Sequence, residues 1–244
     1  MIRVYYNSED NFGDKLNNWL IKKITGQEAV WVSPSEEDPF YMCIGSILNH
    51  DAPAAIVWGA GCAQFDDEIP AKKIITTRGF LTAEMTHNFC GITPEYVGDP
   101  GLLIKNYYDR PVPMSHEVGI IPHFVEYATA LKNFPGYKII DVRLPVEKFI
   151  DEVRSCKRIF SSTLHGLICA DVYGIPSRWA LFDSKIGGDG FKFHDYFTTL
   201  ENVDYHYPLL MFYPYQVERK FHWMNERIKI GIDLTKLLSL CPFS

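Results

Sequence analysis

Short apolar runs alternate with amphipathic segments along most of the chain. Residues 2–6 are typical of a buried strand, and residues 15–25 carry apolar side chains at the spacing of one helix face. Further apolar runs predict strands at 29–32, 41–44, 55–58, 73–76 and 96–97, with a helix over 80–89. Strands that alternate with helices in this way indicate parallel sheets with helices on their faces.

A polar stretch with two prolines interrupts the alternation at residues 105–116. Beyond it the pattern restarts, with strands predicted at 117–121, 138–142, 159–160 and 177–181 and helices at 125–133 and 146–156. We therefore expect an α/β protein with two Rossmann-like domains that face a cleft. The predicted domains are residues 1–110 and residues 111–244, with a carboxyl-terminal helix that packs back on the first.

Composition narrows the class of protein. The 244 residues are 47% hydrophobic and 22% charged, as in a soluble globular protein, and the net charge of −6 disfavours nucleic acid as a partner. The six cysteines show no spacing typical of a metal site. The first residues resemble a strand and not a signal peptide, and no apolar run is long enough for a membrane helix. We expect a cytoplasmic protein.

The segment with the most chemical content is 158–171. A short strand ends in a cluster of hydroxyl side chains, Ser162 or Thr163 is a suitable helix N-cap, and His165 falls in the first turn of an apolar helix. Ligands bind at the carboxyl ends of strands in such sheets, and helix N-termini favour anions. Histidine can transfer protons near neutral pH. The segment predicts an anion site with an acid–base group, although a capping histidine without a chemical role fits it as well.

Four other loops have a place at the same cleft. Gly13 and Asp14 follow the first strand, where glycine allows close approach to a ligand, or where Asp14 simply caps the next helix. Arg78 precedes a helix and is suited to grip a phosphate or a carboxylate, or to form a surface ion pair. His123 opens the first strand–helix loop of the second domain. Lys192, after a glycine-rich loop, is an anion clamp or an ordinary surface charge.

Taken together, these segments resemble the polysaccharide pyruvyl transferase family. The similarity spans about residues 1–200, and the run 191–196 is similar to the branch that acts on bacterial exopolysaccharides. The motifs that carry the resemblance are Asn11-Phe12-Gly13-Asp14, Arg78-Gly79, Gly98-Asp99-Pro100, Ile121-Pro122-His123, Ser161-Ser162-Thr163-Leu164-His165-Gly166 with Ala170, and Gly174-Ile175-Pro176.

The resemblance implies a fold like that of GT-B glycosyltransferases and a defined reaction. The pyruvyl group of phosphoenolpyruvate would move to two hydroxyls of a sugar to form a cyclic ketal, with no metal and no cofactor besides that donor. The acceptor would be a polysaccharide or a lipid-linked sugar, and the latter would bring the protein into peripheral contact with the inner face of a membrane. The first domain would hold the acceptor and the second the donor.

These positions give a set of candidate site residues. His165 is the predicted catalytic acid and base. The predicted substrate-binding residues are Gly13, Asp14, Arg78, His123, Ser162, Thr163, Gly166 and Lys192.

One position departs from the family pattern, and two other functions stay open. Many family members carry arginine where Thr163 stands, so Arg78, Lys192 or Arg178 would have to hold the donor here. A sugar-nucleotide glycosyltransferase of the same architecture would be protected against heat by a nucleoside diphosphate. A non-catalytic relative that binds glycans or anions would never release phosphate.

Overall fold

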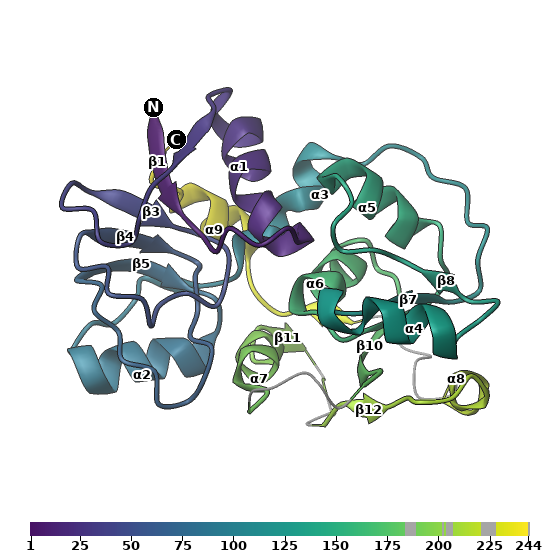
Figure 1. The fold of residues 1–244 in the computed structure, drawn as a ribbon. Coiled ribbons are helices and arrows are strands. Elements are labelled where there is room, and N and C mark those ends of the chain that lie inside the picture. Colours follow the sequence, from purple (N-terminus) through teal and green to yellow (C-terminus); the bar gives the residue numbers. More distant parts are fainter. Residues whose placement is uncertain (184–188, 202, 204–206, 221–227, 244) are drawn as a thin grey trace.

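The computed structural model describes residues 1–183, 189–201, 203, 207–220 and 228–243. Two parallel sheets lie side by side in it (Figure 1). The first contains β1 (Ile2–Tyr5), β2 (Ala29–Trp31), β3 (Phe40–Met42), β4 (Ala55–Trp58), β5 (Lys73–Thr77) and β6 (Tyr96–Val97). The second contains β7 (Gly119–Ile121), β8 (Lys138–Ile139), β9 (Ile159–Ser161), β10 (Ser177–Leu181) and β12 (Leu209–Leu210).

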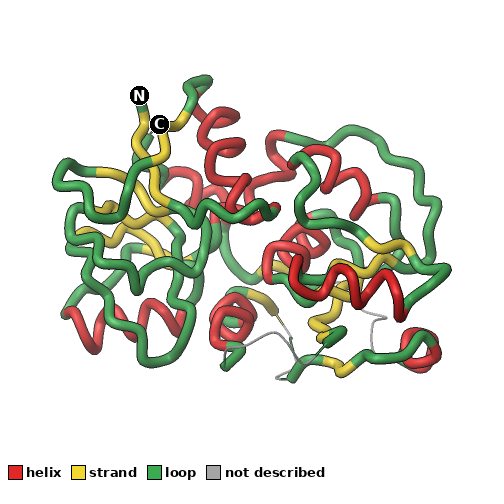
Figure 2. The backbone as a smooth tube through the Cα atoms, viewed as in Figure 1, coloured by secondary structure: helices red, strands yellow, loops and turns green. Residues whose placement is uncertain are grey.

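Helices connect the strands and cover the sheets (Figure 2). They are α1 (Phe12–Thr25), α2 (Phe80–Cys90), the 3₁₀ turn η1 (Pro100–Leu103), α3 (Ile104–Tyr107), the 3₁₀ turn η2 (Phe124–Glu126), α4 (Tyr127–Asn133), α5 (Val146–Arg154), α6 (Leu164–Val172), α7 (Phe191–Phe197), α8 (Tyr215–Arg219) and α9 (Leu234–Ser239). A separate antiparallel pair joins β11 (Leu200–Glu201) to β13 (Lys229–Ile230).

The two sheets share one strand order. The first runs β2-β1-β3-β4-β5-β6, and the second runs β8-β7-β9-β10-β12. In each sheet, the strand that comes second in sequence (β2 or β8) lies at the edge, beside the strand that comes first (β1 or β7). The third strand (β3 or β9) lies on the other side of the first, so the strand order reverses there. Ligands of open α/β sheets bind outside the carboxyl ends of the strands at this reversal. The expected pair of Rossmann-like domains is confirmed, and the topology indicates β1/β3 and β7/β9 as the ligand-binding edges.

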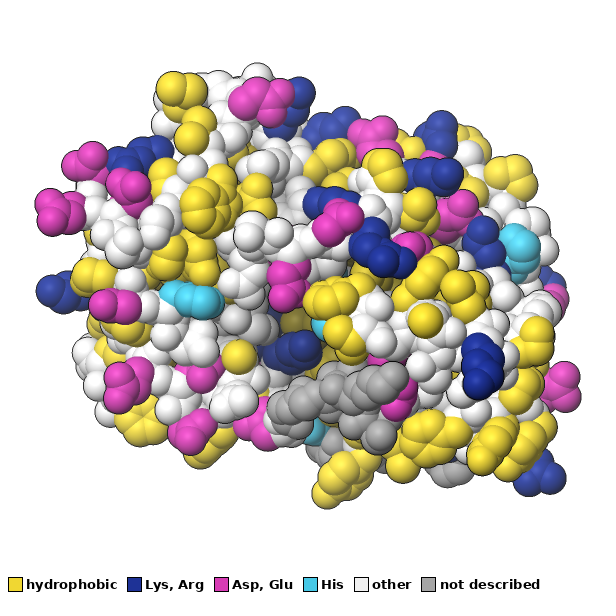
Figure 3. All heavy atoms as spheres, viewed as in Figure 1, with side chains coloured by type: hydrophobic (Ala, Val, Ile, Leu, Met, Phe, Trp, Pro, Cys, Tyr) yellow, Lys and Arg dark blue, Asp and Glu magenta, His cyan; other side chains and the backbone are white. Residues whose placement is uncertain are grey.

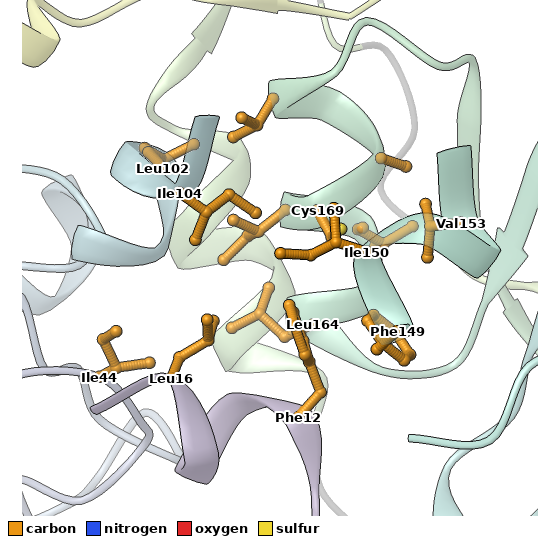
Figure 4. Packing of buried hydrophobic residues seen from close by; sticks show 14 of the residues in the cluster. Phe12, Leu16, Ile44, Leu102, Ile104, Phe149, Ile150, Val153, Leu164 and Cys169 are labelled. Atoms are coloured by element: carbon orange, nitrogen blue, oxygen red, sulfur yellow. The ribbon is translucent and has the colours of Figure 1, made fainter. Parts of the chain in front are cut away.

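A single hydrophobic cluster joins the two domains (Figure 4). Helix α1, which follows the first strand of the first domain, packs on α5 and α6 of the second. The rings of Phe12 and Phe149 stack there with centroids 4.1 Å apart. Burial of this apolar surface on both sides fixes the start of α1 next to the start of α6.

The carboxyl-terminal helix α9 returns to the first domain, as the sequence predicts. The indole N–H of Trp58 donates to the carbonyl of Leu237 at 3.3 Å, and α9 packs on β6 and η1. The predicted boundary at residue 110 falls between α3 and β7, in the segment 108–115, which has no regular structure. It stays a prediction, because η1 and α3 pack on α6 across it.

Helix α1 begins three residues before the predicted start, at Phe12. Asn11 is its N-cap, since the side-chain oxygen of Asn11 accepts from the backbone N–H of Asp14 at 3.0 Å. The alternative in which Asp14 is the cap is therefore wrong. Asp14 lies inside the first turn, where its carboxylate accepts from the amide of Asn11. Gly187 and Gly188 of the predicted glycine-rich loop lie outside the described residues.

Candidate active site

A cavity of about 150 Å³ lies where both sheets reverse their strand order. Its walls come from the segments that follow β1, β3, β7, β8 and β9, and from the start of α7. Figure 3 shows a hollow between the two domains, with basic, acidic and histidine side chains around it. Among the predicted site residues, those that line the cavity are Gly13, Asp14, His123, Thr163, His165 and Lys192.

The turn between β9 and α6 is held by hydroxyl groups. Thr163 is the N-cap, and its Oγ1 accepts from the backbone N–H of Gly166 at 3.2 Å. A Cβ on Gly166 would lie 2.4 Å from Ser161 Oγ, so only glycine fits this turn. The expected cap is confirmed, and His165 is the second residue of the helix. Gly166 itself shapes the turn without lining the cavity.

The imidazole of His165 lies between the two domains. Its side chain is 14% exposed, and its Nε2 lies 3.4 Å from Oδ2 of the fully buried Asp99. The opposite edge of the ring lies against Gly13, where a Cβ would be only 2.3 Å from His165 Nδ1. Glycine at position 13 therefore makes room for the ring beside the cavity.

The start of α1 faces the start of α6 across the cavity. Unpaired N–H groups and helix dipoles at two converging N-termini favour an anion. Asp14 is buried at the same place, and burial raises its pKa to about 7, against the opposing effects of the Asn11 hydrogen bond and of His165. Near neutral pH this carboxyl group is therefore protonated in part of the molecules, which reduces its repulsion of an anion.

Lys192 supplies a cation to the cavity from the start of α7. The side chain is half-buried, and its Nζ lies 5.4 Å from the centroid of the Phe193 ring. Among the described residues Lys192 forms no hydrogen bond and no ion pair within 4 Å, and the carboxylate of Glu9, on the same cavity, attracts it from a longer distance. Burial, followed by repulsion from Arg78, lowers the pKa of Lys192. A bound anion would attract the ammonium group and so oppose both effects.

His123 and Ser162 connect the loops of the second domain. Ser162 Oγ accepts from the backbone N–H of His123 at 2.8 Å and donates to the buried carboxylate of Glu126. Ser162 thus lies behind the cavity wall and positions it. Burial, with a smaller effect of Lys192, lowers the pKa of His123 to about 4. The His123 imidazole is consequently neutral at pH 7, suited to hydrogen bonding with an uncharged hydroxyl.

Arg78 lies apart from the other candidates. Its guanidinium is fully buried and donates to Asp195 Oδ2 at 2.9 Å and to Ser46 Oγ at 2.7 Å. Ser46 lines the cavity, whereas Arg78 and Arg178 do not. Neither the direct grip on a ligand nor the surface ion pair matches these contacts. They support a role for Arg78 in positioning Ser46 and, through Asp195, helix α7.

Two buried carboxylates near the cavity were not among the predicted site residues. Asp99 follows β6, where sequence alone indicates only a stiff turn, yet its Oδ2 faces His165. Glu126 accepts from the backbone N–H groups of Phe182 and Asp183 as well as from Ser162. The sequence does contain a signal for Asp99, because this residue comes shortly after a predicted strand, as Arg78 and His165 do. For Glu126 the sequence gives no signal, since packing alone buries it.

Within the described residues no group of three histidine, cysteine, aspartate or glutamate side chains could hold a metal ion. No helix in that part of the chain has the length and apolar character needed to cross a bilayer.

The amino-acid sequence is similar to those of two known proteins. The chain is 29% identical over 209 residues to an uncharacterised protein of Acanthamoeba polyphaga mimivirus, over 80% of this chain and 72% of that protein. It is 25% identical over 212 residues to the succinoglycan biosynthesis protein ExoV of Rhizobium meliloti, over 80% of this chain and 64% of that protein.

Structural similarity agrees at the level of the fold. An uncharacterised protein of Klebsiella pneumoniae, known from a crystal structure, superposes with a TM-score of 0.52 at 10% identity, over 86% of this chain and 92% of that one. The family model for polysaccharide pyruvyl transferases matches residues 56–180, just over half of the chain, and includes the Asp99 turn, the His123 loop and the His165 helix start. The chain belongs to the polysaccharide pyruvyl transferase family.

Proposed function

We propose that this protein transfers the pyruvyl group of phosphoenolpyruvate to two hydroxyls of a sugar, forming a cyclic ketal and releasing phosphate. One observation carries the proposal beyond the family. Lys192, a half-buried cation that forms no ion pair within 4 Å among the described residues, lines the same small cavity as His165. Two helix N-termini border that cavity, so it is suited to an anion that undergoes proton transfer.

The size of the cavity supports a small donor. Its volume of about 150 Å³ is similar to that of a protein cavity that holds one benzene molecule. Sites for larger ligands enclose roughly 300–1,000 Å³. A three-carbon phosphate therefore matches the volume of this open cavity better than a sugar nucleotide, most of which would lie outside it.

The reaction needs one proton delivered and two removed. A proton is added to C3 of phosphoenolpyruvate, one sugar hydroxyl attacks C2, and a second hydroxyl then displaces phosphate from the same carbon. Each hydroxyl loses its proton as its C–O bond forms, and phosphate leaves with the electrons of its own C–O bond. One of these two protons replaces the proton delivered to C3, and the other goes to the departing phosphate. His165 is placed to act as the acid for C3 and then as a base. Lys192 and the amides at the starts of α1 and α6 would stabilise the negative charge of the donor.

The acceptor would approach from the first domain. Asn7, Glu9 and Asn11, in the segment after β1, line the cavity with polar groups that can hydrogen-bond to sugar hydroxyls. Neutral His123, from the second domain, lines the same cavity. This arrangement supports a sugar whose two reacting hydroxyls reach the donor between the domains.

The proposal is tested by turnover with phosphoenolpyruvate and a panel of simple and lipid-linked glycosides. Phosphate release should depend on the acceptor, and mass spectrometry should find the acceptor enlarged by one pyruvate less one water. His165→Gln should lose about 10²–10⁴-fold in rate, the usual contribution of a positioned acid–base group. His87→Gln, an exposed histidine on α2, should retain the wild-type rate.

Other outcomes would contradict the proposal. Protection against heat by a nucleoside diphosphate, without turnover of phosphoenolpyruvate, would indicate a glycosyltransferase. Tight binding of phosphoenolpyruvate without phosphate release for any acceptor would indicate a non-catalytic relative. A wild-type rate in His165→Gln would leave His165 as a helix residue without a chemical role.

A further inference from the structure

We propose that Asp99 is a positioning residue that fixes the tautomer of His165, with the proton on Nε2, so that Nδ1 is the nitrogen that exchanges protons in the cavity. The role of Nδ1 in proton exchange rests on the proposed function. The tautomer itself does not, because it is a property of the folded protein and can be measured without substrate.

The first support is the environment of the two facing atoms. Asp99 Oδ2 and His165 Nε2 lie 3.4 Å apart, and both are buried from solvent. Neither has a hydrogen-bond partner elsewhere in the described part of the chain. The separation exceeds that of a formed hydrogen bond, and a small rotation of the imidazole closes it. A buried carboxylate oxygen can only accept, so an N–H on Nε2 is the arrangement that satisfies both atoms.

The second support is the way Asp99 is held. Its Oδ1 accepts from the backbone N–H of Gly101 at 2.8 Å, at the start of η1, so this oxygen is already used. The other oxygen is thereby directed at α6, on which η1 packs closely. The carboxylate is fully buried and cannot turn to water. Its orientation is therefore fixed by the cap, independently of the histidine.

The third support is the position of the opposite edge of the ring. His165 Nδ1 lies against Gly13, and both residues line the cavity. With Nε2 turned to Asp99, Nδ1 is the nitrogen with access to a ligand. Asp14, one residue further along α1, also lines the cavity and interacts electrostatically with His165. The carboxylate–imidazole arrangement follows the general logic of a histidine whose second nitrogen is held by a buried acid.

This arrangement has a consequence for the two domains. Asp99 follows the last strand of the first sheet, and His165 follows β9 of the second. The pair exists only when the domains are docked as in Figure 1. Docking would therefore set the tautomer of His165 as well as close the cavity.

The test is ¹⁵N NMR of histidine-labelled protein above the pH at which the imidazole is charged, with the His165 signals assigned by His165→Gln. The wild type should carry the proton on Nε2 and show Nδ1 as the unprotonated nitrogen. In Asp99→Asn the amide oxygen still accepts from Gly101, so the amide NH₂ faces Nε2 and should shift the proton to Nδ1. The kcat should fall about 10²–10⁴-fold, while the KM for phosphoenolpyruvate changes less than fivefold.

Asp233→Asn is the matched control. Asp233 also caps a helix, α9, by accepting from backbone N–H groups. Unlike Asp99 it is exposed, and it contacts no histidine among the described residues. This variant should leave the His165 tautomer and kcat unchanged. A structural effect of losing a carboxylate cap would appear in both variants, whereas the tautomer shift should appear only in Asp99→Asn.

Each result decides the matter. A wild-type His165 with its proton on Nδ1, or an unchanged tautomer in Asp99→Asn, would overturn the proposal, and the wild-type spectrum decides it even if the variant does not fold. The expected tautomers in a protein that never releases phosphate would support the Asp99 assignment while the proposed function fails. The expected tautomers with an unchanged kcat in Asp99→Asn would overturn the role of Nδ1 in proton exchange.

Discussion

At the scale of single residues, the environment of each side chain determines what it can contribute. Lys192 and Asp14 line the same cavity. Burial lowers the pKa of Lys192 and raises the pKa of Asp14, so that it favours the neutral form of both side chains. His123 is neutral at pH 7 for the same reason. Sequence identifies such residue types and their loops, but burial is a property of the assembled fold. The sequence could therefore suggest Lys192 as a cation for the site without excluding an ordinary surface charge.

The raised pKa of Asp14 predicts a pH dependence of stability. The folded carboxyl group, with a pKa of about 7, binds its proton more tightly than the unfolded group, whose pKa is near 3.8. Its contribution to the free energy of unfolding therefore decreases as pH rises from 4 to 7. Asp14→Asn should remove this loss, so the variant should gain stability relative to the wild type across that range, by at most about 4 kcal/mol.

Urea denaturation at several pH values between 4 and 7 measures the difference. Asn at position 14 keeps an oxygen for the hydrogen bond from Asn11, so the cap should survive. Asp233→Asn, at an exposed cap, provides the comparison. A difference between Asp14→Asn and the wild type that is constant with pH, or that decreases as pH rises, would show that Asp14 is not buried as a carboxylic acid.

At the scale of elements, apolar runs predict strands well where polar residues flank them. The predicted strands 55–58 and 177–181 coincide with β4 and β10. The start of α1 was predicted too late, because Asn11 and Asp14 are both good caps and only the fold shows which side chain accepts. The local sequence pattern also does not predict that α1 packs close to α6. This contact results from the cluster that packs α1 on α5 and α6.

The contact between these helices predicts an unusual effect of Gly13→Ala. Alanine at a helical position normally stabilises by up to about 1 kcal/mol relative to glycine. Here its Cβ would lie 2.3 Å from His165 Nδ1, so we expect a net loss of about 1–3 kcal/mol from overpacking. A double-mutant cycle with His165→Ala isolates the cause, because removal of the ring should abolish the loss. Equal costs of Gly13→Ala in both backgrounds would contradict the proposed clash.

At the scale of the whole molecule, contacts distant in sequence connect the domains around the cavity. Arg78 of the first domain pairs with Asp195, which lies 117 positions further along the chain. Asp195 is part of α7, the helix that also carries Lys192. The same carboxylate accepts from the hydroxyl and backbone N–H of Thr82. No local pattern could reveal this partner, so the sequence suggested a ligand or a surface carboxylate for Arg78, where the structure has the buried Asp195. The shared strand order of the two sheets became visible only from strand pairing.

The buried Arg78–Asp195 pair predicts a large effect of breaking it. Arg78→Met leaves Asp195 as an uncompensated buried charge and should lower the free energy of unfolding by about 3–5 kcal/mol. Arg78→Met combined with Asp195→Leu should lose less than the sum of the single changes. If Arg78 positions α7, Asp195→Asn should also weaken phosphoenolpyruvate binding, although Asp195 does not line the cavity. Weaker binding in Arg78→Met alone would instead indicate that Arg78 grips the donor.

Calorimetric titration of phosphoenolpyruvate into the wild type and Lys192→Met tests the donor site most directly. Loss of a charged hydrogen bond costs about 1.5–3 kcal/mol, so the affinity of Lys192→Met should fall by roughly one to two orders of magnitude. Lys132→Met, at an exposed lysine of α4, should bind like the wild type. Equal affinity of Lys192→Met and wild type, or binding of a sugar nucleotide in place of phosphoenolpyruvate, would contradict the assignment of this cavity as the donor site.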